Sequence, residues 1–160
     1  MSVKNRLFWV AAIAGLILDQ VSKFILMRSL ELNQSIPLWE GVFHLTFVTN
    51  KGAAFSLFSE QGEWLRWLSL IVSLGLMMLA WLGPPMNRWE QLGYGCILAG
   101  ALGNGIDRFL YGEVIDFLDF RLIRFPVFNL ADVLINIGIV CLLIATFIKP
   151  PNGNGKHPST

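Results

Sequence analysis

Four long apolar stretches dominate the sequence. They run over residues 7–27, 64–82, 92–110 and 130–148, each close to the roughly 20 residues that an α-helix needs to cross a bilayer core. Tryptophans lie at the ends of the middle stretches, as in the aromatic belts of membrane proteins: Trp64, Trp67, Trp81 and Trp89. The pattern predicts an all-α membrane protein, a four-transmembrane-helix bundle that forms a single domain over residues 1–148.

The connection between the first two stretches is about 36 residues long, too long for a simple turn. Within it, Phe43, Leu45 and Phe47 alternate with other residues, which is the period of a β-strand with one apolar face. We therefore expect a small extracytoplasmic β-sheet in a clamp loop between helices 1 and 2. Residues 111–129 are expected to form a loop, and residues 149–160 a disordered cytoplasmic tail.

Lysines and arginines near the stretches indicate the orientation. Their numbers are equal on the two sides, but the higher density in short segments on one side and the basic start of the first helix favour cytoplasmic N- and C-termini. Lys4 and Arg6 before the first stretch also fit a cleaved signal peptide, although nothing after Leu18 resembles a small-residue cleavage site.

The composition agrees with a membrane protein. Hydrophobic residues make up 54% of the chain and charged residues 14%, with a net charge of +1. These values exclude a disordered chain, a nucleic-acid binder with a basic face and an ordinary cytosolic enzyme. The two cysteines, Cys96 and Cys141, are expected to be small core residues.

A few charged side chains lie within or at the edges of the apolar stretches: Asp19, Lys23, Asp107, Arg108 and Asp132. A charge at the centre of a membrane helix costs about 2.5–3.5 kcal/mol on insertion scales. With the N-terminus inside, all five fall toward the outer half of the bundle. They therefore predict a functional site there.

Simpler structural explanations remain open for these residues. Asp19 and Lys23 lie four residues apart and can form an ion pair on one helix face. Arg108 can bind a neighbouring carboxylate or extend toward lipid headgroups. Asn129 followed by Asp132 fits a helix N-cap. Gly95, Ala99 and Gly103 form a small-residue stripe that favours close helix packing, and Asp116 and Asp119 fit a solvated loop.

The chemistry available to such a site is limited. A Ser–His arrangement would need Ser56 to meet His44, and a metal would want histidines or several close carboxylates. Two aspartates brought together would share one proton, so that one activates water while the other polarises a carbonyl group. A rival hypothesis is a small ion- or proton-coupled transporter with Asp19/Lys23 and Asp107/Arg108 as relay pairs, but the inner halves of the helices carry no matching polar path.

Four blocks follow one another along the chain: Asp19-Gln-Val-Ser-Lys23, Asn50-Lys-Gly-Ala-Ala-Phe-Ser56, Gly103-Asn-Gly-Ile-Asp-Arg108 with Gly112-Glu-Val-Ile-Asp-Phe117, and Phe125-Pro-Val-Phe-Asn-Leu-Ala-Asp132. In this order they resemble the lipoprotein signal peptidase (signal peptidase II) family, bacterial membrane aspartyl peptidases. The resemblance covers nearly the whole chain. Gly105 departs from it, because the family usually has a bulky apolar residue there.

The resemblance implies that Asp116 and Asp132 are the catalytic pair, whereas Asp119 has no family role. It implies a prolipoprotein substrate with a diacylglyceryl cysteine, cut just before that cysteine by an activated water, with no metal or organic cofactor and no nucleic acid. The expected location is the bacterial cytoplasmic (inner) membrane, with the site at the outer leaflet in contact with membrane lipid, and a monomer suffices. The implied supporting residues are Asp19, Lys23, Asn50, Asn104, Arg108 and Asn129. A non-catalytic relative would lack Asp116 or Asp132.

Overall fold

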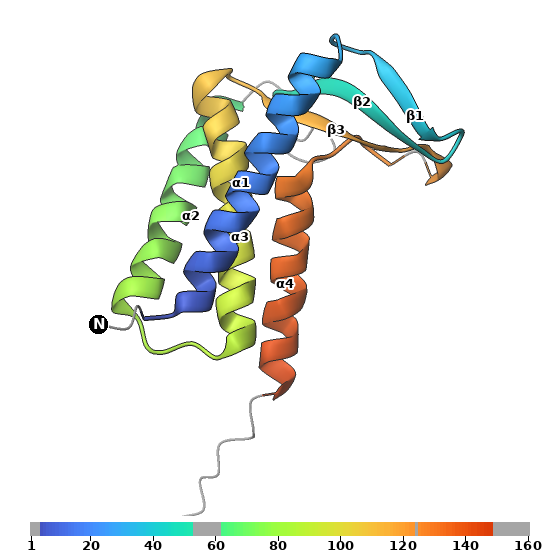
Figure 1. Cartoon of the computed structure of the whole chain (residues 1–160). Helices are drawn as coiled ribbons and strands as arrows, with labels where there is room; N and C mark the ends of the chain where they lie inside the picture. The colour runs from blue at the N-terminus through green and yellow to red at the C-terminus, as the bar shows by residue number, and fades with distance from the viewer. Residues whose placement is uncertain (1–3, 53–61, 124, 149–160) are drawn as a thin grey trace, which may run out of the picture.

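Four long helices and three short strands make up the computed structural model, which describes residues 4–52, 62–123 and 125–148 (Figure 1). In chain order the elements are α1 (Arg6–Ser29), β1 (Ser35–Trp39), β2 (Phe43–Asn50), α2 (Gly62–Leu82), α3 (Arg88–Leu110), β3 (Val114–Phe120), the short 3-10 helix η2 (Arg121–Ile123) and α4 (Leu130–Ile148).

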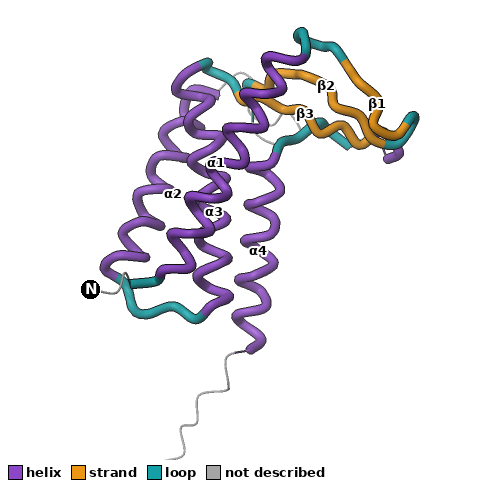
Figure 2. The backbone as a smooth tube through the Cα atoms, in the orientation of Figure 1, coloured by secondary structure: helices purple, strands orange, loops and turns teal. Residues whose placement is uncertain are grey.

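The helices run side by side, and the sheet projects from one end of the bundle (Figure 2). Helix α3 is the central element, because it packs against α1, α2 and α4, while α1 and α4 touch each other much less. The bundle is thus organised around one helix with three neighbours. This arrangement explains why α3 carries more glycines than the helices around it.

Three of the described helices are long and apolar enough to cross a membrane: α1, α4 and residues Glu63–Leu82 of α2. The chain is therefore mostly helical and suited to a membrane. Helix α3 has 23 residues and begins four residues before the predicted stretch, because Asn87 and Glu90 form a capping box at its start. The predicted tail and residues 53–61 of the predicted clamp loop lie outside the described residues.

The small-residue stripe of α3 lies against α1, as predicted. A β-carbon added at Gly95 would lie 2.6 Å from the Phe8 carbonyl oxygen, and one added at Gly103 would meet the Asp19 carboxylate. Another glycine of α3, Gly93, faces α4, where a β-carbon would lie 2.7 Å from Leu142 Cγ. Glycine at these positions lets the backbones approach closely.

The remaining expectations about α3 and α4 concern single residues. Cys96 and Cys141 are buried and reduced, which confirms them as small core residues. Gly105, where the family usually has a larger residue, lies against α2: a β-carbon there would be 3.0 Å from Ser69 Cβ. The departure at Gly105 therefore coincides with a close approach of α2.

The sheet is antiparallel with the order β1–β2–β3, and the predicted strand around Phe43 is confirmed as β2. The prediction of a loop over residues 111–129 is wrong, because Val114–Phe120 form β3, which pairs with β2. No clean period-two pattern marks this strand, since its first four residues are all buried. Ile115 and Phe117 pack with Leu26 and Leu30, which attaches the sheet to the end of α1.

Gly95→Ala is expected to lower the free energy of unfolding by about 1–3 kcal/mol, because the added methyl group meets the α1 backbone. The matched control is Gly75→Ala in α2, where nothing lies within 4 Å of an added β-carbon. This control should be neutral or stabilising, since alanine favours helices over glycine by up to about 1 kcal/mol. Thermal unfolding in detergent measures both; equal effects of the two substitutions would contradict the packing described here.

Candidate active site

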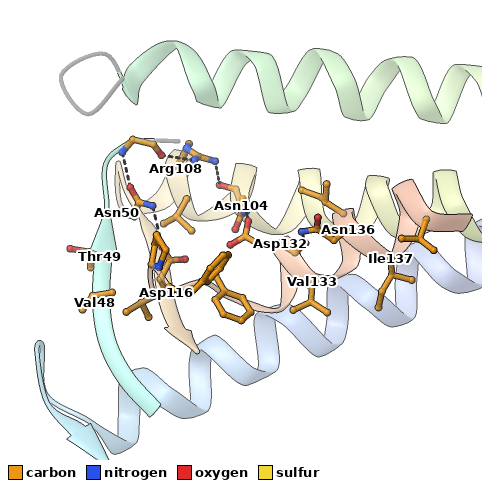
Figure 3. Close-up of a pocket in the computed structure, with 18 of the residues that line it drawn as sticks. Val48, Thr49, Asn50, Asn104, Arg108, Asp116, Asp132, Val133, Asn136 and Ile137 are labelled. Atoms are coloured by element: carbon orange, nitrogen blue, oxygen red, sulfur yellow. Dashed lines mark hydrogen bonds between the residues drawn. The ribbon is translucent and has the colours of Figure 1, made fainter. Parts of the chain in front are cut away.

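A cavity of about 1190 Å³ lies where the sheet meets the end of the bundle (Figure 3). Its polar wall is formed by side chains from β2, α3, β3 and α4, whereas α4 and the segment from Phe125 to Phe128 together supply most of the apolar wall. The polar side chains in this wall are Thr49, Asn50, Asn104, Arg108, Asp116, Asp132 and Asn136. The structure thus brings together five of the predicted site residues at one cavity.

Asp116 lies in β3 and is only 2% exposed. Asn129 Nδ2 donates to its Oδ1 at 2.7 Å, and Asn50 Nδ2 donates to its Oδ2 at 3.2 Å. The register of the sheet explains the second contact, since Asn50 pairs with Val114, two residues before Asp116. Far from being a solvated loop residue, Asp116 is buried between two amide donors.

Asp132 lies in the first turn of α4. The backbone N–H of Asp132 donates to Asn129 Oδ1 at 3.0 Å, and the backbone N–H of Asn129 donates back to Asp132 Oδ2 at 3.2 Å. This exchange confirms the predicted N-cap. Asn104 Nδ2 also donates to Asp132 Oδ1 at 2.9 Å. Asn129 therefore caps the helix and contacts Asp116 at the same time.

The two carboxylates receive neutral donors rather than cations. Within the described part of the chain, neither Asp116 nor Asp132 belongs to an ion pair. Burial, and next the negative charge of Asp132, raise the pKa of Asp116 from 3.8 to about 7, although the hydrogen bonds from Asn50 and Asn129 oppose the shift. This shift brings the proton equilibrium of the Asp116 carboxyl close to neutral pH.

Asp119 contrasts with Asp116 although both belong to β3. Burial acts to raise its pKa, but hydrogen bonds from Thr46 Oγ1 at 2.6 Å and Arg121 Nε at 2.8 Å, with the Arg121 charge, bring the pKa below 3.8. Asp119 thus links β3 to β2 and does not line the cavity.

The Ser–His arrangement considered from the sequence is not tested, because Ser56 lies outside the described residues. His44 Nδ1 lies 3.3 Å from a different serine hydroxyl, Ser35 Oγ.

A buried ion cluster lies behind the cavity. Lys23 Nζ contacts Asp19 Oδ2 at 2.8 Å and Asp107 Oδ2 at 2.7 Å, and it donates to Asn104 Oδ1 at 3.1 Å. The predicted Asp19–Lys23 pair is confirmed, and Asp107 pairs with Lys23 rather than with Arg108. Of the two relay pairs in the transport hypothesis, Asp19/Lys23 is present as an ion pair, whereas Asp107 and Arg108 form no ion pair with each other in the described part of the chain.

The cluster also holds the backbone next to each cavity carboxylate. Asp19 Oδ1 accepts a hydrogen bond from the N–H of Ala131 at 2.9 Å, one residue before Asp132. Asp107 Oδ2 accepts one from the N–H of Ile115 at 3.3 Å, one residue before Asp116. The same ion cluster thereby fixes the start of α4 and the start of β3.

Arg108 reaches across the cavity from α3. Its Nη2 donates to the Gly52 carbonyl oxygen at 3.0 Å and its Nη1 to the Asn104 carbonyl oxygen at 3.4 Å. Among the residues that the structure describes, its buried Nε has no hydrogen-bond partner. Within the same residues, Arg108 forms no ion pair with a carboxylate.

The sequence analysis missed two side-chain amides near the site, those of Gln20 and Asn136. Gln20 Nε2 donates to Asp107 Oδ1 at 3.1 Å and to the Gly103 carbonyl oxygen at 3.2 Å. Asn136 lines the cavity. The signal for both is an amide within an apolar stretch. Among the described residues, no group of three or more histidine, cysteine, aspartate or glutamate side chains is arranged to hold a metal ion.

Comparison with known proteins gives a consistent result. The sequence model of a family described as signal peptidase (SPase) II matches residues 11–148. A lipoprotein signal peptidase from Cyanothece sp. is 65% identical over 155 residues, which are 95% of this chain and 90% of the relative. One from Microcystis aeruginosa is 66% identical over 148 residues, 92% of this chain and 96% of the relative.

The fold also has solved counterparts. A structure described as a bacterial membrane enzyme superposes with a TM-score of 0.81 at 30% identity, covering 94% of this chain and 93% of that one. A second, with the same description, has a TM-score of 0.77 at 31% identity and covers 88% of this chain and 92% of that one.

The raised pKa of Asp116 predicts a pH dependence of stability. Between its ordinary pKa of 3.8 and about 7, the buried carboxyl holds a proton that the unfolded chain has lost, so this contribution to stability falls as pH rises through that window. The loss approaches about 1.4 kcal/mol per pH unit. Asp116→Asn should therefore gain stability relative to the unsubstituted protein from pH 5 to pH 7, with no further gain above.

The control is Asp119→Asn. Because the pKa of Asp119 is lowered, its carboxylate is ionised in both folded and unfolded chains over this pH range. Melting temperatures in detergent from pH 5 to 8 should show the trend for Asp116→Asn alone. Parallel curves for Asp116→Asn and the unsubstituted protein would show that Asp116 is ionised in the folded state.

Proposed function

This chain belongs to the signal peptidase II family, and on that basis we propose that Asp116 and Asp132 are the catalytic pair of an aspartic-type peptidase. The family assignment makes the protein a membrane enzyme that removes signal peptides from prolipoproteins. One observation carries the proposal for the pair: two carboxylates from separate elements face one cavity among amide donors, and no cation of the described residues pairs with either.

In the proposed mechanism the pair shares one proton, and Asp116 holds it at rest because of its raised pKa. Ionised Asp132 takes a proton from a water molecule, whose oxygen attacks the carbonyl carbon of the scissile peptide bond. Protonated Asp116 donates a hydrogen bond to the carbonyl oxygen. Collapse of the tetrahedral intermediate breaks the C–N bond, and the departing amine takes up the proton that Asp132 received from the water, which returns the pair to its resting state. Because the two carboxyl groups themselves activate the water and polarise the carbonyl group, the proposed mechanism needs no metal or organic cofactor.

The supporting residues take distinct roles in this proposal. Asn50 and Asn129 orient Asp116, while Asn104 and the backbone of Asn129 orient Asp132. Asp19 and Lys23 act from behind, through the backbone contact of Asp19 with Ala131 and the contact of Lys23 with Asn104. Arg108 lines the cavity beside both carboxylates, where its guanidinium positions the substrate.

The apolar part of the cavity suits the rest of the substrate. Its lining continues along α4 from Val133 to Ile144. The rise along the helix from Asp132 to Ile144, twelve residues further on, is about 18 Å. We propose that the apolar segment of the signal peptide lies along this wall, and that the diacylglyceryl cysteine follows the scissile bond with its lipid tails among the membrane lipids.

We further propose a placement in the bacterial inner membrane. Helix α3 would be the fourth span, since its 23 residues measure about 35 Å and its Asn104 and Asp107 are buried against other elements rather than exposed to lipid. Both termini would lie in the cytoplasm and the cavity at the outer leaflet. Residues 1–148 would form one domain, and a monomer suffices because one chain carries both aspartates.

Asp116→Asn and Asp132→Asn, made separately, should each lower cleavage of a diacylglyceryl prolipoprotein by about 10³-fold, as expected when a general acid or base is lost. The measurement is conversion of precursor to cut product in membranes, with folding checked by the melting temperature of the purified variant. Asp119→Asn is the matched control in the same strand and should keep most of the activity. A folded Asp116 or Asp132 variant with near-normal turnover would refute the catalytic pair.

The proposed topology predicts a labelling pattern for single cysteines placed in a Cys96→Ala, Cys141→Ala background. Glu40→Cys and Tyr111→Cys should react with a membrane-impermeant maleimide added outside spheroplasts. Pro85→Cys should react only after permeabilisation. Outside labelling of Glu40→Cys but not of Tyr111→Cys would mean that α3 does not cross the membrane.

A further inference from the structure

We propose that Asn136, one helical turn beyond Asp132 on α4, is a substrate-binding residue that pairs with the backbone of the signal peptide just before the scissile bond. The inference deepens the proposed function and rests on it. Asn136 belongs to none of the four blocks that carry the family resemblance, and it lies at the border between the polar and apolar parts of the cavity (Figure 3).

The surroundings of Asn136 make an amide there unexpected. The neighbouring lining residues on α4 are apolar: Val133, Ile135, Ile137 and Val140. The Asn136 side chain is exposed, in a helix apolar enough to span a membrane. An amide without a hydrogen-bond partner costs about 1–3 kcal/mol by mutational measures and more in hydrocarbon. In a bilayer, the groups of this amide that the protein itself does not bind would therefore need a partner in the cavity.

The contacts within the protein leave most of this amide unused. Asn136 Nδ2 donates one hydrogen bond, to the Asp132 carbonyl oxygen at 2.8 Å. A primary amide has two N–H donors and a carbonyl acceptor. Within the described part of the chain, the second N–H and Oδ1 of Asn136 have no partner. One donor and one acceptor thus remain at the cavity.

Thr146 shows what a purely structural contact on the same helix looks like. Its Oγ1 donates to the Leu142 carbonyl oxygen at 3.0 Å, four residues earlier, just as Asn136 does to Asp132. Serine and threonine satisfy their hydroxyl donors in this way inside membrane helices. Thr146 does not line the cavity. A back-bond alone therefore accounts for Thr146 but not for the two free groups of Asn136.

The substrate supplies the groups that Asn136 lacks. A peptide must be extended at the scissile bond, and its N–H and C=O groups there have no helical partners. In a bilayer each such group needs a partner from the protein. The free N–H and the Oδ1 of Asn136 match the C=O and the N–H of one substrate residue.

The geometry also gives the position. Four residues of helix between Asp132 and Asn136 span about 6 Å, which is about two residues of extended chain. Asn136 lies on the side of Asp132 that leads along the apolar wall, where the signal peptide is proposed to lie. Its partner is therefore the second or third residue before the lipidated cysteine. Proline at that substrate position would be excluded because it has no N–H.

The test combines an enzyme variant with altered substrates. Synthetic diacylglyceryl peptides are prepared with the backbone nitrogen methylated, in turn, at each of the three residues before the cysteine. Asn136→Leu should lower kcat/KM on the unmodified peptide by about 2- to 10-fold, the usual size of a neutral hydrogen bond, mainly through KM. Methylation at the second or third residue should lower the kcat/KM of the unsubstituted enzyme by a similar factor. The same methylation should have little effect on the kcat/KM of Asn136→Leu, which has already lost the contact.

Asn136→Gln should recover part of the loss, because it keeps the amide. Thr146→Val, which removes the matched back-bond outside the cavity, should leave kcat/KM unchanged. The inference would be overturned by an unchanged kcat/KM in Asn136→Leu. It would also be overturned if, at all three positions, the factor lost through methylation were the same in Asn136→Leu as in the unsubstituted enzyme. The proposal for the catalytic pair is tested separately: cleavage that persists in Asp132→Asn, with Asn136 unchanged, would refute the pair without bearing on Asn136.

Discussion

The buried contact of Lys23 with Asp19 and Asp107 is the interaction on which the site depends. Removing three charges from water is costly, and the cost is offset only when each group finds good partners. Here each partner is tied to something else: Asp19 to the backbone at the start of α4, and Asp107 to the backbone at the start of β3. The ion cluster thereby fixes the two chain segments that carry Asp132 and Asp116.

Two asparagines link the ion cluster to the two carboxylates and orient them by hydrogen bonds. Asn104 lies between Lys23 and Asp132, and Asn129 lies between Asp132 and Asp116. Amides suit this role because they donate to a carboxylate without neutralising it. A lysine or arginine in direct contact would lower a carboxyl pKa. Here the cation, Lys23, contacts Asn104, and Asn104 in turn contacts Asp132. The raised pKa of Asp116 therefore comes from its burial and from the negative charge of Asp132.

The sequence predicted the helices well because lipid imposes a simple rule of length and apolarity. It predicted the polar cluster because a charge in an apolar stretch is conspicuous, and the cap at Asn129 because its spacing from Asp132 is local. Strand β3 was missed, since its pairing with β2 is a contact between distant segments and its burial hides the period of two.

Individual side-chain contacts also could not be predicted from the sequence. The pairing of Asp107 with Lys23, rather than with adjacent Arg108, depends on how α1 lies against α3, which only close packing along Gly95 and Gly103 determines. The difference between Asp116 and Asp119 likewise came from the family resemblance and not from local pattern. In the structure it has a physical cause, because one carboxylate meets amides at a cavity and the other meets Arg121.

The most direct test of this account is an infrared titration of the carboxylic acid C=O stretch in the purified protein. The account predicts one buried carboxyl that loses its proton near pH 7. This signal should be absent in Asp116→Asn, and it should move to lower pH in Asp132→Asn because the repelling charge is gone. A carboxyl signal near pH 7 that persists in Asp116→Asn, or no such signal in the unsubstituted protein, would contradict the shared-proton pair.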